Sequence, residues 1–151
     1  MHTVFFSILD KYLGLDYGSV RIGIALSDES KTFAFGKEYI DNDKNAIDRI
    51  NSIISSENIT RIILGYPKNL KGERTKQTLE VENFEEKLRA FIKPGVVKII
   101  RWDERFTSKI AAGSLIESGM KKKKRQQKGN IDIVSAALLL QSYLDSNKSK
   151  T

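Results

Sequence analysis

Hydrophobic positions recur along this chain with two different spacings, which predict strands and helices in turn. Alternating apolar residues mark 11–16 as a strand, and after a tight turn at Gly18 and Ser19 the segment 20–27 alternates as its hairpin partner. Residues 33–40 form a third candidate strand. The early part of the chain therefore predicts an antiparallel arrangement.

Helical spacing first occurs between residues 43 and 56, where isoleucines recur every three or four positions after the candidate caps Asn42 and Asp43. The apolar run at 61–66 is short enough for a buried strand. A second helix follows and is stopped by Pro94, because proline cannot continue a helix. Its predicted apolar face consists of Leu79, Phe84, Leu88, Phe91 and Ile92.

The last third of the chain continues this alternation. Residues 96–102 read as a strand, and Thr107 or Ser108 can cap a helix that Gly119 would end. Asn130 can cap a final helix that is apolar almost all round, which predicts burial against the sheet. The predicted fold class is α/β, with a mixed sheet whose first three strands are antiparallel and whose later strands are parallel, flanked by helices.

The length and the missing residue types narrow the chemistry. A chain of 151 residues is one ordinary domain. It has no cysteine, and His2 is its only histidine, which excludes disulfide scaffolds, thiol nucleophiles, zinc–thiolate sites and histidine-based catalytic pairs. No apolar run approaches the roughly 18–20 residues of a membrane span, so we expect a soluble, cytoplasmic protein with no membrane partner.

The positive charge is concentrated in one segment. The formal net charge is +7, and residues 119–130 carry six of these charges with no acid. Such a segment indicates binding to a polyanion, although a solvated basic loop would have the same composition. Its basic residues are Lys121, Lys122, Lys123, Lys124, Arg125 and Lys128.

Carboxylates stand at the ends of several predicted elements. Asp16 ends the first strand, Asp103 and Glu104 end the last, and Asp132 lies in the first turn of the final helix. Carboxylates from separate elements suit hard cations such as Mg²⁺ or Mn²⁺, which bind phosphate oxygens. The set therefore indicates metal-dependent attack on a phosphodiester.

Each of these acids also has an ordinary structural explanation. Aspartate is common before turns, as at Asp16, and is favoured near a helix N-terminus, as at Asp132. Consecutive strand residues face opposite sides, so Asp103 and Glu104 cannot both face one site if the strand continues. Arg101 and Arg105 could pair with them at the surface. Only the combination of acids favours a metal site.

Two phosphate-binding motifs can be compared with the early hairpin. Gly18 and Gly23 have the glycine spacing of a P-loop, but Ile24 and Ala25 stand in place of its lysine and hydroxyl residue and a strand follows, so a Walker site is excluded. The hairpin also looks like the first phosphate loop of actin-like ATPases. Those proteins need two such domains, whereas this chain supplies one.

Four motifs in order resemble the YqgF family over about nine-tenths of the chain. They are LGLDYGSVRIGIALSD at 13–28, GYP at 65–67 with Gly72, DERFTS at 103–108, and KGNIDIVSAALLLQSYLDS at 128–146 preceded by the basic segment. The resemblance implies a ribonuclease H-like fold related to RuvC-type resolvases. It also implies a nuclease that trims the 5′ end of pre-16S rRNA. Members of the family were earlier described as Holliday junction resolvases.

By position, the resemblance implies that Asp16, Glu104 and Asp132 are catalytic metal ligands for Mg²⁺ or Mn²⁺, with Asp103 as the alternative middle acid. Ser19, Arg21 and Arg105 fall in the same motifs and are candidates for nucleic-acid binding, although bracing of the acids is an equal role for Arg21. Tyr66 and Lys71 depart from the usual family residues. Tyr66 could stack on a base, and ordinary packing is its other explanation.

The predicted organisation is an N-terminal extension at 1–10, one ribonuclease H-like nuclease domain at 11–146 and a polar tail at 147–151. The leading functional hypothesis is a metal-dependent endonuclease for structured RNA in ribosome biogenesis. A resolvase of branched DNA, which would act as a dimer, is the second. A non-catalytic RNA-binding assembly factor is the third, and the sequence leaves monomer or dimer open.

Overall fold

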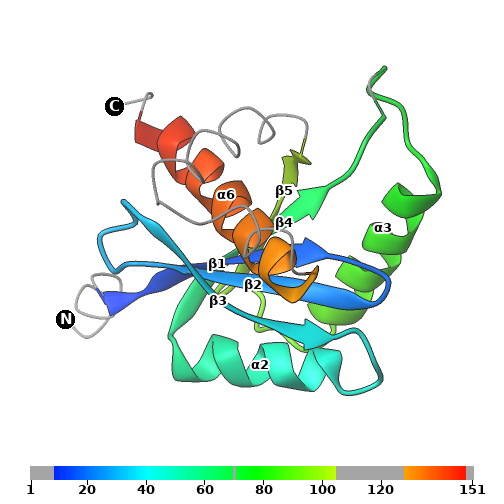
Figure 1. The fold of residues 1–151 in the computed structure, drawn as a ribbon. Coiled ribbons are helices and arrows are strands. Elements are labelled where there is room, and N and C mark those ends of the chain that lie inside the picture. The colour runs from blue at the N-terminus through cyan, green and yellow to red at the C-terminus, as the bar shows by residue number, and fades with distance from the viewer. Residues whose placement is uncertain (1–8, 70, 105–127, 149–151) are drawn as a thin grey trace.

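A computed structural model describes residues 9–69, 71–104 and 128–148 of the chain, which build a mixed sheet between two layers of helices (Figure 1). The bounds of most elements agree with the sequence prediction to within two or three residues. The strands are β1 (Lys11–Tyr17), β2 (Arg21–Ser27), β3 (Ala34–Asp41), β4 (Ile59–Tyr66) and β5 (Lys98–Asp103), and the helices are α2 (Ala46–Ser56), α3 (Lys76–Arg89) and α6 (Lys128–Lys148).

The strand order across the sheet is β3-β2-β1-β4-β5. β1 pairs antiparallel with β2, and β2 pairs antiparallel with β3. β4 joins β1 in parallel, and β5 joins β4 in parallel. The predicted mixed sheet is therefore confirmed. Because β1, β4 and β5 run the same way, their carboxyl ends meet at one edge of the sheet.

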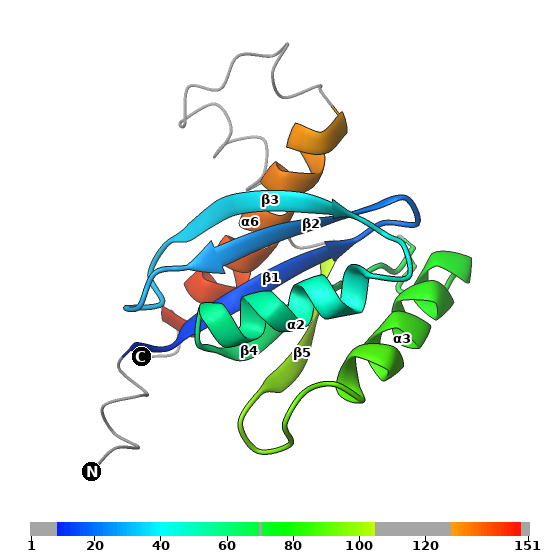
Figure 2. The same ribbon diagram turned by 90° about the horizontal axis from the view of Figure 1, so that it is seen from below.

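One face of the sheet carries the larger hydrophobic core, against α2 and α3 (Figure 2). Branched aliphatic residues from the central strands point into it, including Leu15, Ile24 and Leu64, each fully buried. Ile50 of α2 and Leu88 of α3 close the layer from the other side and are fully buried as well. Burial of such side chains contributes about 1.5–3 kcal/mol each.

The other face of the sheet packs on α6 and depends on small residues. A Cβ atom at Gly14 of β1 would lie 2.9 Å from Cβ of Leu140, and one at Gly36 of β3 would overlap the side chain of Ile133. Ala25 of β2 also lies in this smaller core, beside Ala136 of α6. Glycine and alanine on neighbouring strands therefore allow the helix to lie close to the sheet.

The start of α2 differs from the prediction. Asn45, rather than Asn42 or Asp43, is the N-cap residue, and it makes no side-chain capping bond. The Oδ1 atom of Asp43 accepts a hydrogen bond from the backbone N–H of Asn45 at 2.9 Å. The side chain of Asn42 instead donates to the carbonyl of Gly18 at 2.8 Å. Both polar residues therefore stabilise the loop before the helix.

The predicted apolar face of α3 was partly wrong. Phe84 and Leu88 are buried as expected, but Leu79 is 49% exposed and Phe91 is 52% exposed beyond the helix end at Arg89. The buried stripe instead includes Val81 and the helix begins at the cap Thr75. Leu79 lies outside this buried stripe and is exposed to solvent.

Helix α6 also begins earlier than predicted. It starts at Lys128, so Asn130 lies within it and is not its cap, and Asp132 lies beyond the first turn. The predicted burial is confirmed, since Leu139 and Leu140 are almost completely buried. Within the described segments, no helix is both long and apolar enough to cross a membrane.

Several predicted features lie outside the described residues. They include most of the extension at 1–10, the helix predicted from Thr107 or Ser108, the greater part of the basic segment and the end of the tail at 147–151.

Candidate active site at the carboxyl ends of the parallel strands

Two carboxyl groups meet where β1 and β5 end. Asp16 lies near the end of β1, on the face that packs against α6, because it is two residues beyond Gly14 on the same strand. Glu104 follows directly after β5. A hydrogen bond joins the side chains of Asp16 and Glu104. The parallel arrangement of the strands thus brings together two acids that are 88 positions apart in the sequence.

This carboxyl pair has shifted acid–base properties. Burial, the charge of Glu104 and the hydrogen bond between the two groups raise the pKa of Asp16 well above its usual value, with a further contribution from Asp132. Burial and the charge of Asp103 also raise the pKa of Glu104, although the hydrogen bond from Asp16 partly offsets that rise. Two carboxylates held this close resist being ionised together. A bound cation would relieve that repulsion.

Asp132 lies near this pair on α6 and is held by an arginine. The Nε atom of Arg21, at the start of β2, donates to Oδ2 of Asp132 at 2.9 Å. Both side chains are about one-quarter exposed. In this structure Arg21 therefore braces Asp132, one of the two roles that the sequence left open for it. The guanidinium carbon of Arg21 also lies 6.0 Å from the centroid of the Tyr39 ring.

Two glycines position these acids, and sequence reasoning did not assign them this role. A Cβ atom at Gly23 of β2 would overlap the backbone oxygen of Asp132, so glycine is needed for the first turns of α6 to approach β2. A Cβ atom at Gly65 of β4 would overlap the carboxylate of Glu104. Gly65 stood within the GYP motif, and Gly23 was considered only for the P-loop that the sequence excludes.

Asp103 and Glu104 separate to opposite sides of β5. Asp103 lines a pocket together with Tyr66 and Arg101, on the side of the sheet that faces α3. Glu104 lies at Asp16 instead. The alternation expected for consecutive strand residues thus separates the two candidate middle acids, and Glu104 is the one that bonds to Asp16.

The other candidate binding residues are less completely described. Ser19 is exposed in the turn between β1 and β2. Lys128 is the first residue of α6, whereas Arg105 and the basic run at 121–125 lie outside the described residues. Their predicted contacts with nucleic acid stay predictions.

Among the described residues, no three acidic or histidine side chains are grouped closely enough to form a complete metal site. The two-carboxylate pair of Asp16 and Glu104 nevertheless fits a divalent cation by its chemistry. Its donors are hard oxygens, and burial together with neighbouring carboxylates raises the pKa of both groups. Asp132, held by Arg21, is the nearest further acid.

Comparison with known proteins identifies the family of this fold. Residues 10–146 match the family model described as "RuvX: Holliday junction resolvase". The chain belongs to the RuvX family. Two curated relatives named "Putative pre-16S rRNA nuclease" are 40% and 41% identical, from Sulfurihydrogenibium sp. and Ruminiclostridium cellulolyticum; the alignments cover 91% and 89% of this chain and 91% and 94% of theirs. The resemblance deduced from the motifs is therefore confirmed, and the relatives carry the name of the predicted enzyme class.

Solved structures of more distant proteins share the fold of this chain. Fowlpox virus resolvase, solved with Holliday junction DNA, aligns with a TM-score of 0.60 and 15% identity over 91% of this chain and 98% of its own. Thermus thermophilus RuvC in complex with a Holliday junction substrate aligns with a TM-score of 0.59 and 11% identity over 90% and 95%. At such low identity the likeness shows the fold alone, and it confirms the predicted ribonuclease H-like class.

Proposed function

We propose that this RuvX-family chain is a metal-dependent endonuclease that hydrolyses phosphodiester bonds in structured RNA and processes the 5′ end of pre-16S rRNA in the cytoplasm. The observation that carries the proposal is the buried contact between Asp16 and Glu104 at the carboxyl ends of two strands. Ligand sites of open α/β sheets lie outside the carboxyl ends of the strands. The names of the curated relatives support the substrate.

Asp16 and Glu104 are the residues that would hold Mg²⁺ or Mn²⁺, and Asp132 is the third proposed ligand. A divalent cation at such a site activates water and stabilises the leaving oxygen of a phosphodiester. Arg21 fixes Asp132 at 2.9 Å and limits its rotation before substrate arrives. Asp103 is the weaker candidate for the middle acid, because it lines the pocket on the other side of the sheet, whereas Glu104 is hydrogen-bonded to Asp16.

Basic residues supply the proposed docking surface for the nucleic-acid backbone. The surface comprises Lys121–Arg125 and Lys128, with Ser19, Arg21 and Arg105 nearer the acids in the sequence motifs. Six phosphate contacts would make log affinity fall with log salt at a slope of about −4 to −5, from roughly −0.7 to −0.9 per contact. A flat salt dependence would remove this docking role.

The decisive experiment compares the full chain with Asp16→Asn on a labelled rRNA precursor, with and without Mn²⁺. We expect Asp16→Asn to lower the cleavage rate by at least about a hundredfold, because the cation supplies several kcal/mol of transition-state stabilisation. Asp48→Asn on α2 is the matched control, since Asp48 is exposed on the opposite layer. Equal rates for wild type and Asp16→Asn would remove the assigned site.

Branched DNA is the second candidate substrate, and the family description together with the two junction-bound neighbours supports it. A two-fold junction needs two symmetric active sites, so this activity requires a dimer. Paired symmetric nicks in a synthetic four-way junction, with no cleavage of precursor RNA, would favour this function. Metal-independent RNA binding that persists in Asp16→Asn, with no turnover of either substrate, would instead indicate a non-catalytic assembly factor.

A further inference from the structure

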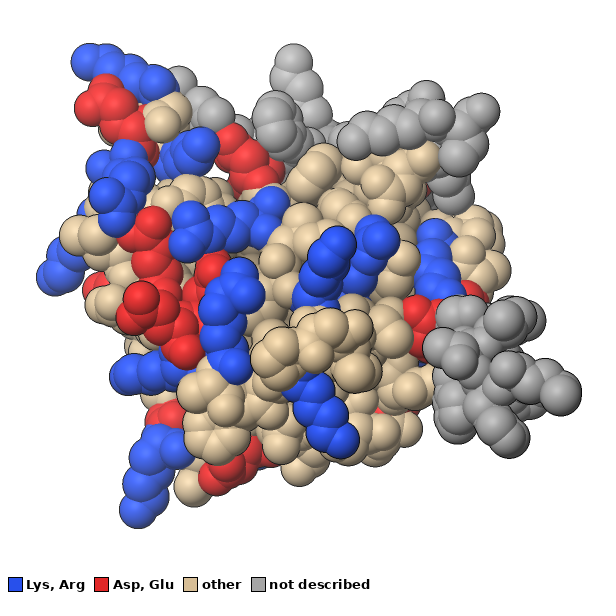
Figure 3. All heavy atoms as spheres, turned by 180° about the vertical axis from the view of Figure 1, so that it is seen from behind, with Lys and Arg blue, Asp and Glu red and all other residues tan. Residues whose placement is uncertain are grey.

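A second polar site lies directly behind the acid pair, on the α3 side of the sheet. It is a pocket of about 500 Å³ where β4 and β5 end. Figure 3 shows basic and acidic side chains interleaved on the surface over α3 and the segment that leads into it. The residues that line the pocket are Tyr66, Lys68, Gly72, Arg74, Arg101 and Asp103.

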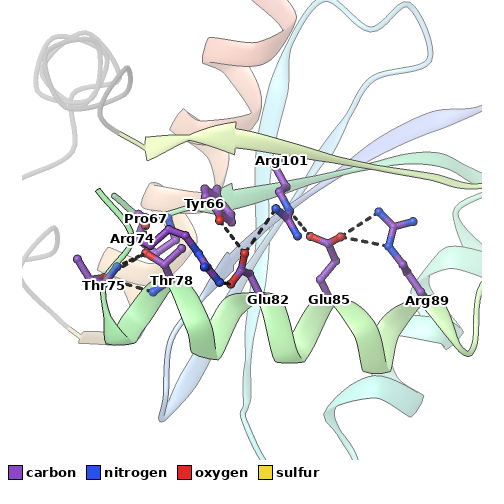
Figure 4. Close-up of polar contacts among 9 residues, drawn as sticks. All are labelled: Tyr66, Pro67, Arg74, Thr75, Thr78, Glu82, Glu85, Arg89 and Arg101. Carbon is purple, nitrogen blue, oxygen red and sulfur yellow. Dashed lines mark hydrogen bonds and ion pairs between the residues drawn. The ribbon is translucent and has the colours of Figure 1, made fainter. Parts of the chain in front are cut away.

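The positive groups of this pocket are held in place by their neighbours (Figure 4). The Tyr66 ring lies beneath two cations, with Nζ of Lys68 5.7 Å and the guanidinium carbon of Arg101 4.7 Å from its centroid. Such cation–π contacts stabilise the position of a cation over an aromatic ring. Tyr66 is 7% exposed, so the ring provides a fixed support.

Glu82 of α3 fixes the same cluster from below. Its carboxylate accepts a hydrogen bond from the Tyr66 hydroxyl at 2.8 Å and pairs with Arg74. A third contact, at 3.7 Å, reaches Arg101, which also donates to Glu85 at 2.7 Å. The hydrogen bonds from Arg74 and Tyr66 lower the pKa of Glu82, so it remains ionised. The carboxylates thus orient the guanidinium groups before any ligand binds.

These contacts leave donors available for a ligand. Arg74 has five N–H donors and remains 60% exposed although it pairs with Glu82. Within the described part of the chain, Lys68 has no ion-pair partner. Lysine and arginine donors together suit a phosphate group, because charge-assisted hydrogen bonds to phosphate are strong and directional.

The pocket and the acid pair are joined through consecutive residues of two neighbouring strands. Gly65 of β4 faces Glu104, whereas Tyr66 lines the pocket. Asp103 lines the pocket, whereas Glu104 contacts Asp16. The two sites therefore lie on either side of the same strand ends, and a nucleic-acid strand that crosses this edge would reach both.

We propose that the pocket formed by Lys68, Arg74 and Arg101 on Tyr66 binds one backbone phosphate of the substrate strand, next to the bond that is cleaved. The inference rests on the nuclease function proposed above. Lys68 and Arg74 supply the charge and the hydrogen bonds. Tyr66 is a positioning residue, because its ring lies under Lys68 and its hydroxyl donates to Glu82, the carboxylate that pairs with Arg74. Arg101 adds a third positive charge on the same ring.

The test measures binding without turnover, in EDTA, by fluorescence anisotropy of a labelled single-stranded RNA. We expect Lys68→Gln and Arg74→Gln each to weaken binding about three- to tenfold and to flatten the salt slope by about 0.7. The matched controls are Lys44→Gln and Arg49→Gln near α2; Arg49 is 45% exposed and pairs with Asp43, much as Arg74 pairs with Glu82. Equal losses in the controls would overturn the proposal.

A substrate-side change identifies the phosphate. We use a series of oligonucleotides, each with one neutral methylphosphonate. At one position the substitution should weaken binding to the wild type, but it should not further weaken binding to Arg74→Gln. The same small loss at every position would overturn the proposal. So would competition by inorganic phosphate without any position-specific loss, since that result assigns a site for free phosphate.

Folding and function are controlled separately. Arg74→Lys keeps the charge and should restore part of the affinity, and unchanged thermal melting of the Gln variants excludes unfolding. The cleavage assay with Asp16→Asn tests the nuclease function, whereas the EDTA assay tests only the pocket. If the wild type cuts RNA but the Lys68→Gln and Arg74→Gln variants bind it as tightly as the wild type, this inference alone is overturned. Position-specific binding without any cleavage would support the pocket and remove the nuclease proposal.

Discussion

The two faces of the sheet achieve close packing by opposite means. The face toward α2 and α3 is filled by large branched residues such as Leu15, Ile24 and Leu64. The face toward α6 uses Gly14 and Gly23, so that a helix backbone lies almost on the strands. On the first face, large buried side chains stabilise the fold. On the second face, glycines bury less apolar area but let α6 approach the strands, which brings Asp132 close to Asp16. The difference shows that the face with less buried hydrophobic area is the one that carries the candidate active site.

The largest expected loss comes from the larger core. Leu64→Ala should lower the free energy of unfolding by about 2–5 kcal/mol, because Leu64 is fully buried and a cavity would remain. Urea denaturation measures this change. Leu79→Ala on α3 is the control, since Leu79 is 49% exposed and its truncation should cost far less. Equal losses would contradict the assignment of the two residues to core and surface.

A smaller loss is expected on the other face from adding atoms. Gly23→Ala should destabilise the protein by about 1–3 kcal/mol, because the new methyl group overlaps the backbone of Asp132 and backbone cannot turn aside as a side chain can. Cleavage should fall as well, since α6 must shift. Thermal melting and a turnover assay test both effects. Lys37→Ala on exposed β3 is the control, and a fully active, equally stable Gly23→Ala would refute the close approach.

The start of α3 should respond by about 1 kcal/mol. The Thr75 side chain accepts a hydrogen bond from the backbone of Thr78, and the Thr78 hydroxyl accepts one from the backbone of Thr75 at 2.9 Å. Thr75→Ala removes half of this capping box. Chemical denaturation should show the loss, and Thr75→Ser should retain most of the stability.

The last change has the opposite sign, because it removes a carboxyl group whose ionised form is disfavoured by burial and by Glu104. Its pKa in the folded protein is raised above the usual 3.8, so the folded state binds a proton more tightly than the unfolded chain. Stability therefore falls as pH rises from about 3.8 through the raised value, and stays lower above it. Asp16→Asn should remove that fall.

Unfolding in urea at a series of pH values, in EDTA, measures this effect. The gain from Asp16→Asn should grow across that pH interval and then stay constant. Added Mg²⁺ should stabilise wild type more than the variant, because a ligand that binds only the folded state adds to its stability. An equal gain at every pH would show that ionisation of Asp16 does not destabilise the folded protein.

Much of this arrangement could be predicted from the sequence because it depends on local periodicity. The alternation of β1 and β2 and the apolar run of α6 identify their elements directly. The buried face of α3 and the cap residue of α6 could not be predicted, because Leu79 and Asn130 both suit a helix and tertiary packing decides their place in it. Propensity is a weak guide where packing decides.

The acids were identifiable from the sequence, but their partners were not. The motifs marked Asp16, Glu104 and Asp132, whereas the ion pair of Asp132 with Arg21 joins residues 111 positions apart. The roles of Gly23 and Gly65 depend on which atoms face them across the fold. Such long-range contacts leave no spacing pattern, and only the three-dimensional arrangement shows them.

The end of β4 and β5 also acts as a ruler. Gly65 and Tyr66, like Asp103 and Glu104, are consecutive residues that face opposite sides, so the distance between the acid pair and the phosphate pocket is set by one strand's thickness and not by a mobile linker. A nucleic-acid strand held in the proposed pocket would then be cut a fixed number of nucleotides from its bound phosphate. Inserting one residue after Tyr66 would move the anchor and shift the cut.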